Sequence, residues 1–236
     1  MQNKPDTQTD ANAAFSEELF ASKRALFVGA HPDDIEFRAG GLVYMMRKRG
    51  VEVIFAIATR GGKGLPGPFR RLLERIRTCH QLRAAQILGG IEVVFYDYPD
   101  GGLPDFVEPF TGDLKSLIET RQPDVVLCWD PDLVSRPHPD HKAAADATSQ
   151  AAVGVKTCFY GAREPNLWVG LDDDALRAKL RALKAHATET PILYFDLRVK
   201  KWLMGWMKAE GAKIGRDYAE TFRLAQLTPQ RPPTSP

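Results

Sequence analysis

Several absences limit what this 236-residue chain can be. Its three cysteines, Cys79, Cys128 and Cys158, are scattered and include no CxxC pair, so they indicate neither a disulfide framework nor a cysteine zinc site. No apolar run approaches the roughly 18 residues that a membrane-spanning helix requires. The polar N-terminus has no secretory signal pattern. We therefore expect a cytoplasmic protein in a reducing compartment, with no membrane partner.

An excess of charge of one sign is also lacking. The 32 Lys and Arg residues nearly balance the 30 Asp and Glu residues, and a net charge of +2 is too mild to predict nucleic acid as a partner. The length suits one α/β domain with a modest appendage. We expect a flexible N-terminal arm at 1–22, a single domain at 23–227 and a disordered, Pro-rich tail at 228–236.

Apolar, β-branched runs alternate with helical patterns along the chain. Strands are expected at 25–31, 51–59, 91–96, 124–129, 157–160 and 218–225, the last of them at an edge. Helices are expected at 42–49 after Gly40 and Gly41, and at 69–88, 111–120, 142–152, 172–188 and 193–209. This alternation predicts an α/β fold, a three-layer α/β/α sandwich around a Rossmann-like, mostly parallel sheet.

The first strand ends in a cluster of polar side chains. Pro32 has no N–H for a sheet and disfavours helix at His31, so the strand should stop there. His31, Asp33 and Asp34 would then lie at the carboxyl end of a strand, where open α/β sheets bind ligands. Two adjacent carboxylates repel each other, and a cation would remove that cost. A polar loop with a helix-capping Asp explains these residues equally well on their own.

A second cluster follows the fourth expected strand, at the start of an Ala-rich helix. It contains His138, Asp140 and His141, and it should lie at the same edge of the sheet as the first. Together, His31, Asp34 and His141 make a set of two imidazoles and one carboxylate. Such a set suits a catalytic Zn²⁺ ion and also suits non-haem Fe²⁺.

The remaining polar residues of the two clusters suggest hydrolysis. Asp33 is a spare carboxylate that could take a proton from a water molecule acidified by the metal. His138 could stabilise or protonate an oxyanion from the other side of the substrate, and Asp140 could orient one of the imidazoles. The Gly-rich loop at 60–68, which contains Lys63, lacks the phosphate-binding GxxxxGK[ST] pattern, so its glycines favour mobility.

Two motifs carry a family resemblance: Ala-His-Pro-Asp-Asp at 30–34 and His-Pro-Asp-His at 138–141. In this order, each after a strand, they resemble the signature of the PIG-L/LmbE-like zinc-dependent N-acetylglucosaminyl deacetylases. Shorter matches occur at 40–41, 77, 88–89, 99–101, 123–126, 184–188 and 219–222.

The resemblance implies a metal-dependent hydrolase that removes the N-acetyl group from an N-acetylglucosamine-type amino sugar or glycoconjugate. Its substrate would be a small amino-sugar molecule, and its cofactor Zn²⁺ or Fe²⁺. The implied metal ligands are His31, Asp34 and His141, with Asp33 as general base and His138 as electrophilic partner. The resemblance also implies that Arg77 and Asp100 contact the sugar hydroxyls.

Two positions depart from the family pattern and leave the acceptor part of the substrate open. His80 stands where members commonly carry Glu, and Gly62 or Lys63 lies where an acidic residue is common. One alternative is therefore an amidase of a sugar–thiol conjugate or an antibiotic precursor. A non-catalytic sugar- or nucleotide-binding α/β domain is the second alternative.

The sequence also suggests structural roles for three further residues. His186 is expected to pack or cap near the end of its helix. Trp202 and Trp206 are four residues apart, a helical spacing that suits either the core or a homo-oligomer contact.

Overall fold

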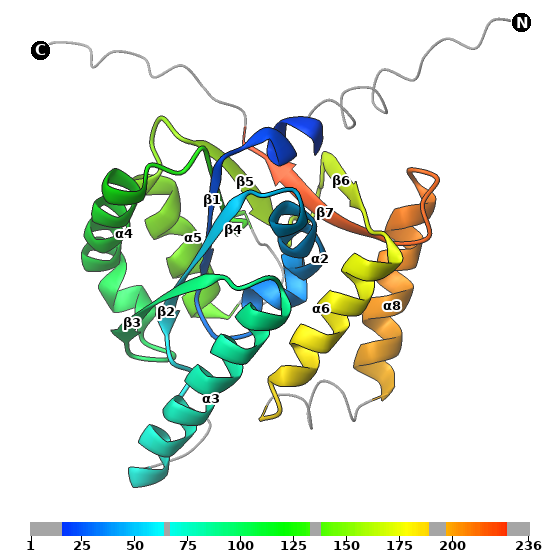
Figure 1. Cartoon of the computed structure of the whole chain (residues 1–236). Helices are drawn as coiled ribbons and strands as arrows, with labels where there is room; N and C mark the ends of the chain where they lie inside the picture. The colour runs from blue at the N-terminus through cyan, green and yellow to red at the C-terminus, as the bar shows by residue number, and fades with distance from the viewer. Residues whose placement is uncertain (1–15, 64–66, 133–137, 189–196, 226–236) are drawn as a thin grey trace, which may run out of the picture.

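The described part of the chain contains one seven-stranded sheet (Figure 1). The computed structural model describes residues 16–63, 67–132, 138–188 and 197–225. The strands are β1 (Arg24–Gly29), β2 (Glu52–Thr59), β3 (Glu92–Tyr98), β4 (Val125–Trp129), β5 (Lys156–Tyr160), β6 (Leu167–Gly170) and β7 (Ala219–Leu224). Their order is β3-β2-β1-β4-β5-β7-β6, and only the pairings of β7 are antiparallel. The expected α/β fold with a mostly parallel sheet is confirmed.

Helices cover both faces of this sheet (Figure 1). One layer contains α2 (Asp34–Lys48), α3 (Pro68–Ile87) and α6 (Asp173–Ala185), with α8 (Leu197–Ala212) packed against α6. The other contains the short 3₁₀ helix η1 (Leu103–Phe106), α4 (Val107–Arg121) and α5 (Pro139–Ala151). In β1, Ala25 and Phe27 face the first layer, whereas Leu26 and Val28 face the second. Burial on both faces explains why the strand is apolar throughout.

Helix α2 begins earlier than the sequence predicts. It starts at Asp34, directly after the first motif, and Gly40 and Gly41 lie inside it. A Cβ at Gly41 would lie 2.5 Å from Leu171 Cδ2, and one at Gly40 would lie 3.2 Å from Lys179 Cγ. The two glycines therefore mark a close approach of α2 to its neighbours, and the expected helix start at this point is wrong.

Strand β7 is not the edge strand that the sequence predicts. It lies between β5 and β6, and Val169 of β6 pairs with Glu220 of β7. The true edge, β6, has only four residues, too few for a periodic pattern to separate it from a loop.

The chain ends are described only in part. Residues 16–21 are helical, and Leu19 within them is fully buried. The expectations for residues 1–15 and for the tail at 228–236 lie outside the described residues. In the described part of the chain, no helix combines the length and the apolar character that a membrane crossing requires.

The strand order reverses between β1 and β4, because the chain crosses to β2 and β3 on one side and to β4 and β5 on the other. Such a reversal opens a crevice at the carboxyl ends of the two central strands. Both sequence motifs follow these two strands.

Candidate active site

The two motifs meet at the carboxyl edge of β1 and β4. His31 lies two residues beyond β1, Asp34 opens α2, and His138 is the N-cap residue of α5. All eight residues that the sequence analysis assigns to the catalytic, metal or substrate site lie in or beside this crevice. They are His31, Asp33, Asp34, Arg77, Asp100, His138, Asp140 and His141.

Three donor atoms converge on one point. His31 Nδ1 lies 3.4 Å from His141 Nε2 and 3.9 Å from Asp34 Oδ2. His141 Nε2 lies 3.1 Å from Asp34 Oδ1. Ligand atoms bound tetrahedrally to Zn²⁺ at roughly 2.0–2.1 Å are about 3.3 Å apart. Two of the three distances, 3.1 and 3.4 Å, match this spacing and the third is wider, so the three side chains form a candidate site for one metal ion.

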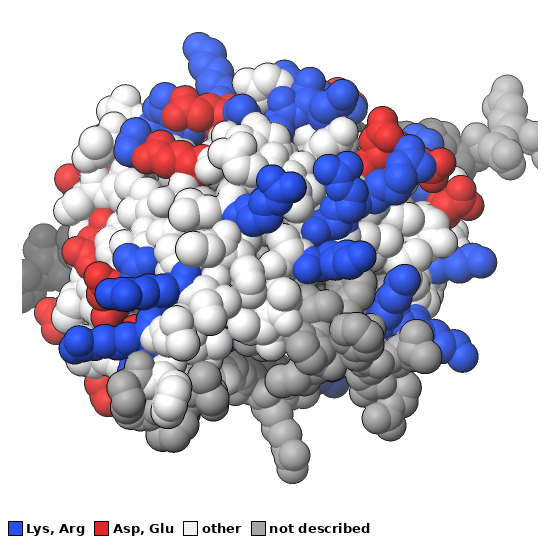
Figure 2. Space-filling view, turned by 60° about the horizontal axis from the view of Figure 1, so that its bottom comes forward, with Lys and Arg blue, Asp and Glu red and all other residues white. Residues whose placement is uncertain are grey.

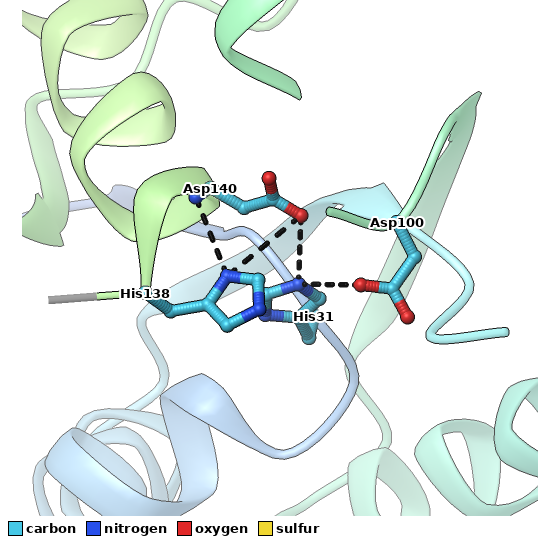
Figure 3. A group of neighbouring side chains, drawn as sticks. All are labelled: His31, Asp100, His138 and Asp140. Carbon is cyan, nitrogen blue, oxygen red and sulfur yellow. Dashed lines mark hydrogen bonds and ion pairs between the residues drawn. The ribbon is translucent and has the colours of Figure 1, made fainter. Parts of the chain in front are cut away.

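The opposite nitrogen of His31 has partners of its own (Figure 3). His31 Nε2 lies 3.0 Å from Asp140 Oδ2 and 3.1 Å from Asp100 Oδ1. An N–H at Nε2 satisfies these carboxylates and leaves the Nδ1 lone pair for a cation, an arrangement common among metal-binding histidines. Asp140 thus lies where the sequence hypothesis places it, against an imidazole.

The charges around His31 favour a cation. Burial by itself would lower the pKa of His31, but the carboxylates of Asp100, Asp140 and Asp34 outweigh that effect and raise it to about 10. The same surroundings favour a metal ion, which would take the place of the proton on Nδ1. The donor set and its electrostatics therefore both fit a divalent cation.

A second group of side chains also has donor atoms close enough for one ion: His31, Asp100, His138 and Asp140. Three of these side chains already accept backbone hydrogen bonds. Asp140 Oδ2 accepts from Gly101 N at 2.6 Å, Asp100 Oδ2 accepts from Lys63 N at 2.8 Å, and His138 Nδ1 accepts from Asp140 N at 3.3 Å. This group is better described as the hydrogen-bonded support of His31.

Asp34 is held by donors that leave one oxygen for the metal. Its Oδ2 accepts from Ala30 N at 2.8 Å, from His31 N at 2.9 Å and from Trp129 Nε1 at 3.0 Å. Burial alone would raise the pKa of Asp34, but His141 and His31 hold it well below its usual range. The carboxylate is therefore ionised and oriented towards His141.

Trp129 is a functional residue that the sequence reading missed. Besides its hydrogen bond to Asp34, its ring stacks on His141 with centroids 4.1 Å apart and planes 13° apart. One side chain thus fixes two of the three candidate ligands. The available signal was its place as the last residue of β4, at the edge where both motifs lie.

Asp33 has an unusual backbone conformation. Its φ of 94° lies in the left-handed region, which costs a non-glycine residue about 1–3 kcal/mol and tends to occur at functional sites. Its side chain is 17% exposed, so a water molecule can reach it, and its Oδ2 lies 3.9 Å from Arg77 Nη2. The carboxylate has the access that a general base requires.

His138 has a tautomer set by the backbone. Because Nδ1 accepts from Asp140 N, the proton of the neutral ring is on Nε2. Burial and the nearby His31 lower the pKa of His138, which favours this neutral form. The side chain is 38% exposed, so its Nε2–H can donate to a ligand in the crevice.

Arg77 and Asp100 both lie at the site, with contacts beyond those the resemblance implies. Arg77 donates to Gly61 O and to Pro32 O, each at 3.1 Å. Asp100 contacts His31, and burial, which would raise its pKa, is outweighed by that imidazole, so its pKa falls to about 2. Contact of either residue with a sugar stays a prediction.

Among the charged side chains described on the outer surface at this end, basic ones are the more prominent. Figure 2, with the bottom of Figure 1 turned forward, shows Lys and Arg side chains gathered over the middle of the face and acidic ones mainly towards its left and upper rim. Asp34, Asp100 and Asp140 are almost fully buried, so they contribute little to that surface. Negative charge is thus concentrated inside the crevice.

The sequence and the structure both have recognisable relatives. The family model of GlcNAc-PI de-N-acetylases, named PIG-L, matches residues 26–152. A diacetylchitobiose deacetylase of Thermococcus kodakarensis is 27% identical over an alignment 234 positions long. The alignment covers 86% of this chain and 83% of the relative. A 1D-myo-inositol 2-acetamido-2-deoxy-alpha-D-glucopyranoside deacetylase of Corynebacterium diphtheriae is 26% identical, covering 70% of this chain and 76% of the relative.

Among solved structures, the N,N'-diacetylchitobiose deacetylase of Pyrococcus horikoshii, complexed with its inhibitor MPG, has a similar fold. Its TM-score to this chain is 0.76 at 25% sequence identity, and the match covers 97% of this chain and 98% of the other. The similarity therefore extends over nearly the whole of both chains.

Proposed function

Because the chain belongs to the PIG-L family of metal-dependent N-deacetylases, we propose that it removes the N-acetyl group from an N-acetylglucosamine-type amino sugar or glycoconjugate. The observation that carries this proposal is the convergence of His31 Nδ1, the Asp34 carboxylate and His141 Nε2, with the water-accessible carboxylate of Asp33 next in sequence. Amide hydrolysis needs an electrophile and a base in the same site.

His31, Asp34 and His141 would hold Zn²⁺, with Fe²⁺ as the alternative metal, since two imidazoles and a carboxylate suit both. When bound, the cation supplies a positive charge that acidifies water and polarises the amide carbonyl. Asp100 and Asp140 hold the His31 ring so that Nδ1 faces His141 and Asp34, the other two residues that would bind the ion.

The other residues move protons and stabilise charge. Asp33 takes a proton from the attacking water, whose oxygen forms a bond to the acetyl carbonyl carbon. The Nε2–H of His138 donates to the oxyanion that develops on the carbonyl oxygen. Asp33 returns its proton to the nitrogen as the carbon–nitrogen bond breaks, so that the free amine and acetate leave.

The proposed function is tested by metal removal. Protein stripped with a chelator should release no acetate from N-acetylglucosamine derivatives, and one equivalent of Zn²⁺ or Fe²⁺ should restore release. Acetate assays paired with metal analysis rank the two metals. Bound metal without acetate from any amino sugar would contradict the substrate class and favour sugar–thiol amides. A chain that binds no metal would overturn the proposal as a whole.

Location and assembly are part of the same proposal. The three cysteines are unpaired, which supports a reducing, cytoplasmic location. Trp202 stacks on Phe37 and on Trp206 while 52% of its surface stays exposed. An exposed aromatic stack of this kind supports a contact between copies of the chain.

Replacing Trp129 by Phe is expected to weaken metal binding about 10- to 100-fold, because an outer residue that orients ligands typically contributes this much. The substitution keeps an aromatic ring against His141 but removes the N–H that Asp34 accepts. Competition between the protein and a chromophoric chelator measures the change.

The control is Trp202→Phe, the same substitution at an exposed ring that stacks on Phe37 and Trp206 and not on a candidate ligand. It should leave the metal dissociation constant unchanged. Equal metal affinity in Trp129→Phe and wild type would show that Trp129 does not orient the ligands.

A further inference from the structure

Helix α3 holds both ends of one peptide group in the first motif. Arg77 Nη2 donates to Pro32 O at 3.1 Å, and Asp33 N donates to Gln81 Oε1 at 3.1 Å. This carbonyl and this N–H belong to the same peptide bond. Arg77 and Gln81 are four residues apart, so both point from one face of α3. The orientation of the Pro32–Asp33 peptide is therefore set from a single helix.

The Gln81 amide has only one favourable orientation. Gln81 is fully buried, and its Nε2 donates to Glu36 Oε1 at 2.5 Å. Rotating the amide by 180° would place its oxygen against the Glu36 carboxylate and its NH₂ group against the N–H of Asp33. Glu36 thus requires the orientation in which Gln81 accepts from Asp33.

Glu36 also lies close to a third helix. Its Oε2 lies 3.7 Å from Nε2 of His186, the buried C-cap residue of α6, a distance that suits an ion pair and is too long for a hydrogen bond. The network therefore connects α2, α3 and α6 next to Asp33.

This network touches the residue whose backbone is strained. A left-handed φ at Asp33 persists only if the surroundings impose it, and the two hydrogen bonds to its preceding peptide do so. We propose that Gln81 is a positioning residue for this deacetylase. Oriented by Glu36 and His186, it fixes the backbone of Asp33 so that the carboxylate faces the crevice. The inference rests on the proposed role of Asp33 as general base.

The first experiment compares Gln81→Met with Gln86→Met, a matched change at an exposed position of the same helix. Gln81→Met should lower kcat per metal-loaded molecule about 10- to 100-fold, since a misplaced catalytic group costs about this much. KM and metal content should stay near wild type. Gln86→Met should match wild type in all three. An unchanged kcat in metal-loaded Gln81→Met would overturn the proposal.

A swap of the two side chains tests the hydrogen-bonding role itself. Gln81→Glu alone places two carboxylates together and should lose activity. Adding Glu36→Gln restores a complementary pair, in which the new carboxylate at 81 accepts from Asp33 N and from the new amide at 36. The double variant should recover at least about tenfold in kcat over Gln81→Glu, each measured at its own pH optimum. A double variant no more active than Gln81→Glu would contradict the assignment.

The third measurement does not depend on activity. Amide hydrogen exchange of Asp33, followed by NMR, should be about tenfold faster or more in Gln81→Met than in wild type and in Gln86→Met. If wild type hydrolysed no amino sugar, the proposed function would fail, while protection of this amide would still report on the hydrogen bond. Equal exchange in Gln81→Met and wild type would overturn the positioning role.

Discussion

Asn in place of Asp33 is expected to lower kcat for deacetylation about 10²- to 10⁴-fold, the usual contribution of a general base. An amide at this position keeps the size and the left-handed backbone, which Asn tolerates better than most residues. It has no lone pair basic enough to take a proton from water. Acetate release under saturating substrate measures the loss.

The metal must stay bound for this result to identify the base. Asp33 is not among the three converging donors, so metal content in Asp33→Asn should equal that of wild type. Asp173→Asn, at an exposed position in the first turn of α6, serves as the matched control and should keep full activity. Loss of metal together with activity in Asp33→Asn would instead assign this residue to the metal shell.

The site could be predicted because each motif is local in sequence and follows a strand. Pro32 ends β1 and places His31 and Asp34 at the carboxyl edge, and the same logic brings His138 and His141 to that edge after β4. Parallel strands share one carboxyl edge, so two separate motifs were sufficient to predict one site. The prediction that the two motifs lie together required no knowledge of side-chain packing.

The supporting residues could not be predicted in this way. From the sequence, Trp129 is a strand residue, Gln81 is one polar residue on an amphipathic helix, and Glu36 is an acidic residue before the helix expected at 42–49. Their roles depend on which helix faces meet, and that is decided by tertiary packing. The same limit explains the missed start of α2, where Gly40 and Gly41 reflect contacts with residues far along the chain.

A buried ion pair joins α2, α6 and β7 where Gly40 and Gly41 bring α2 close to its neighbours. Lys179 and Glu220 are both fully buried, with Nζ and Oε1 2.6 Å apart. Lys179 Nζ also donates to Phe37 O at 2.7 Å, and the Glu220 carboxylate accepts from Gly41 N at 2.9 Å and from Leu42 N at 2.8 Å. The pair thus bonds to backbone groups inside helix α2, in the segment that follows the candidate metal ligand Asp34.

Lys179→Met is expected to lower the free energy of unfolding by about 3–5 kcal/mol, the cost of leaving a buried charge without its partner. Met preserves the length of the aliphatic chain, so the effect reports mainly on the ammonium group. Burial already lowers the pKa of Lys179 despite the opposing effect of Glu220, which shows how strongly the site disfavours an isolated charge. Urea unfolding of the metal-loaded protein measures the change.

Adding Glu220→Gln to Lys179→Met should recover part of this loss. The amide at 220 no longer carries an unpaired charge, and its oxygen still offers an acceptor to the backbone of α2. The control, Lys184→Met, removes an exposed lysine from the same helix and should leave the urea midpoint near wild type. If Lys179→Met were as stable as Lys184→Met, the pair would not hold α2 in place. If the double variant were less stable than Lys179→Met, the backbone contacts of Glu220 would outweigh its charge.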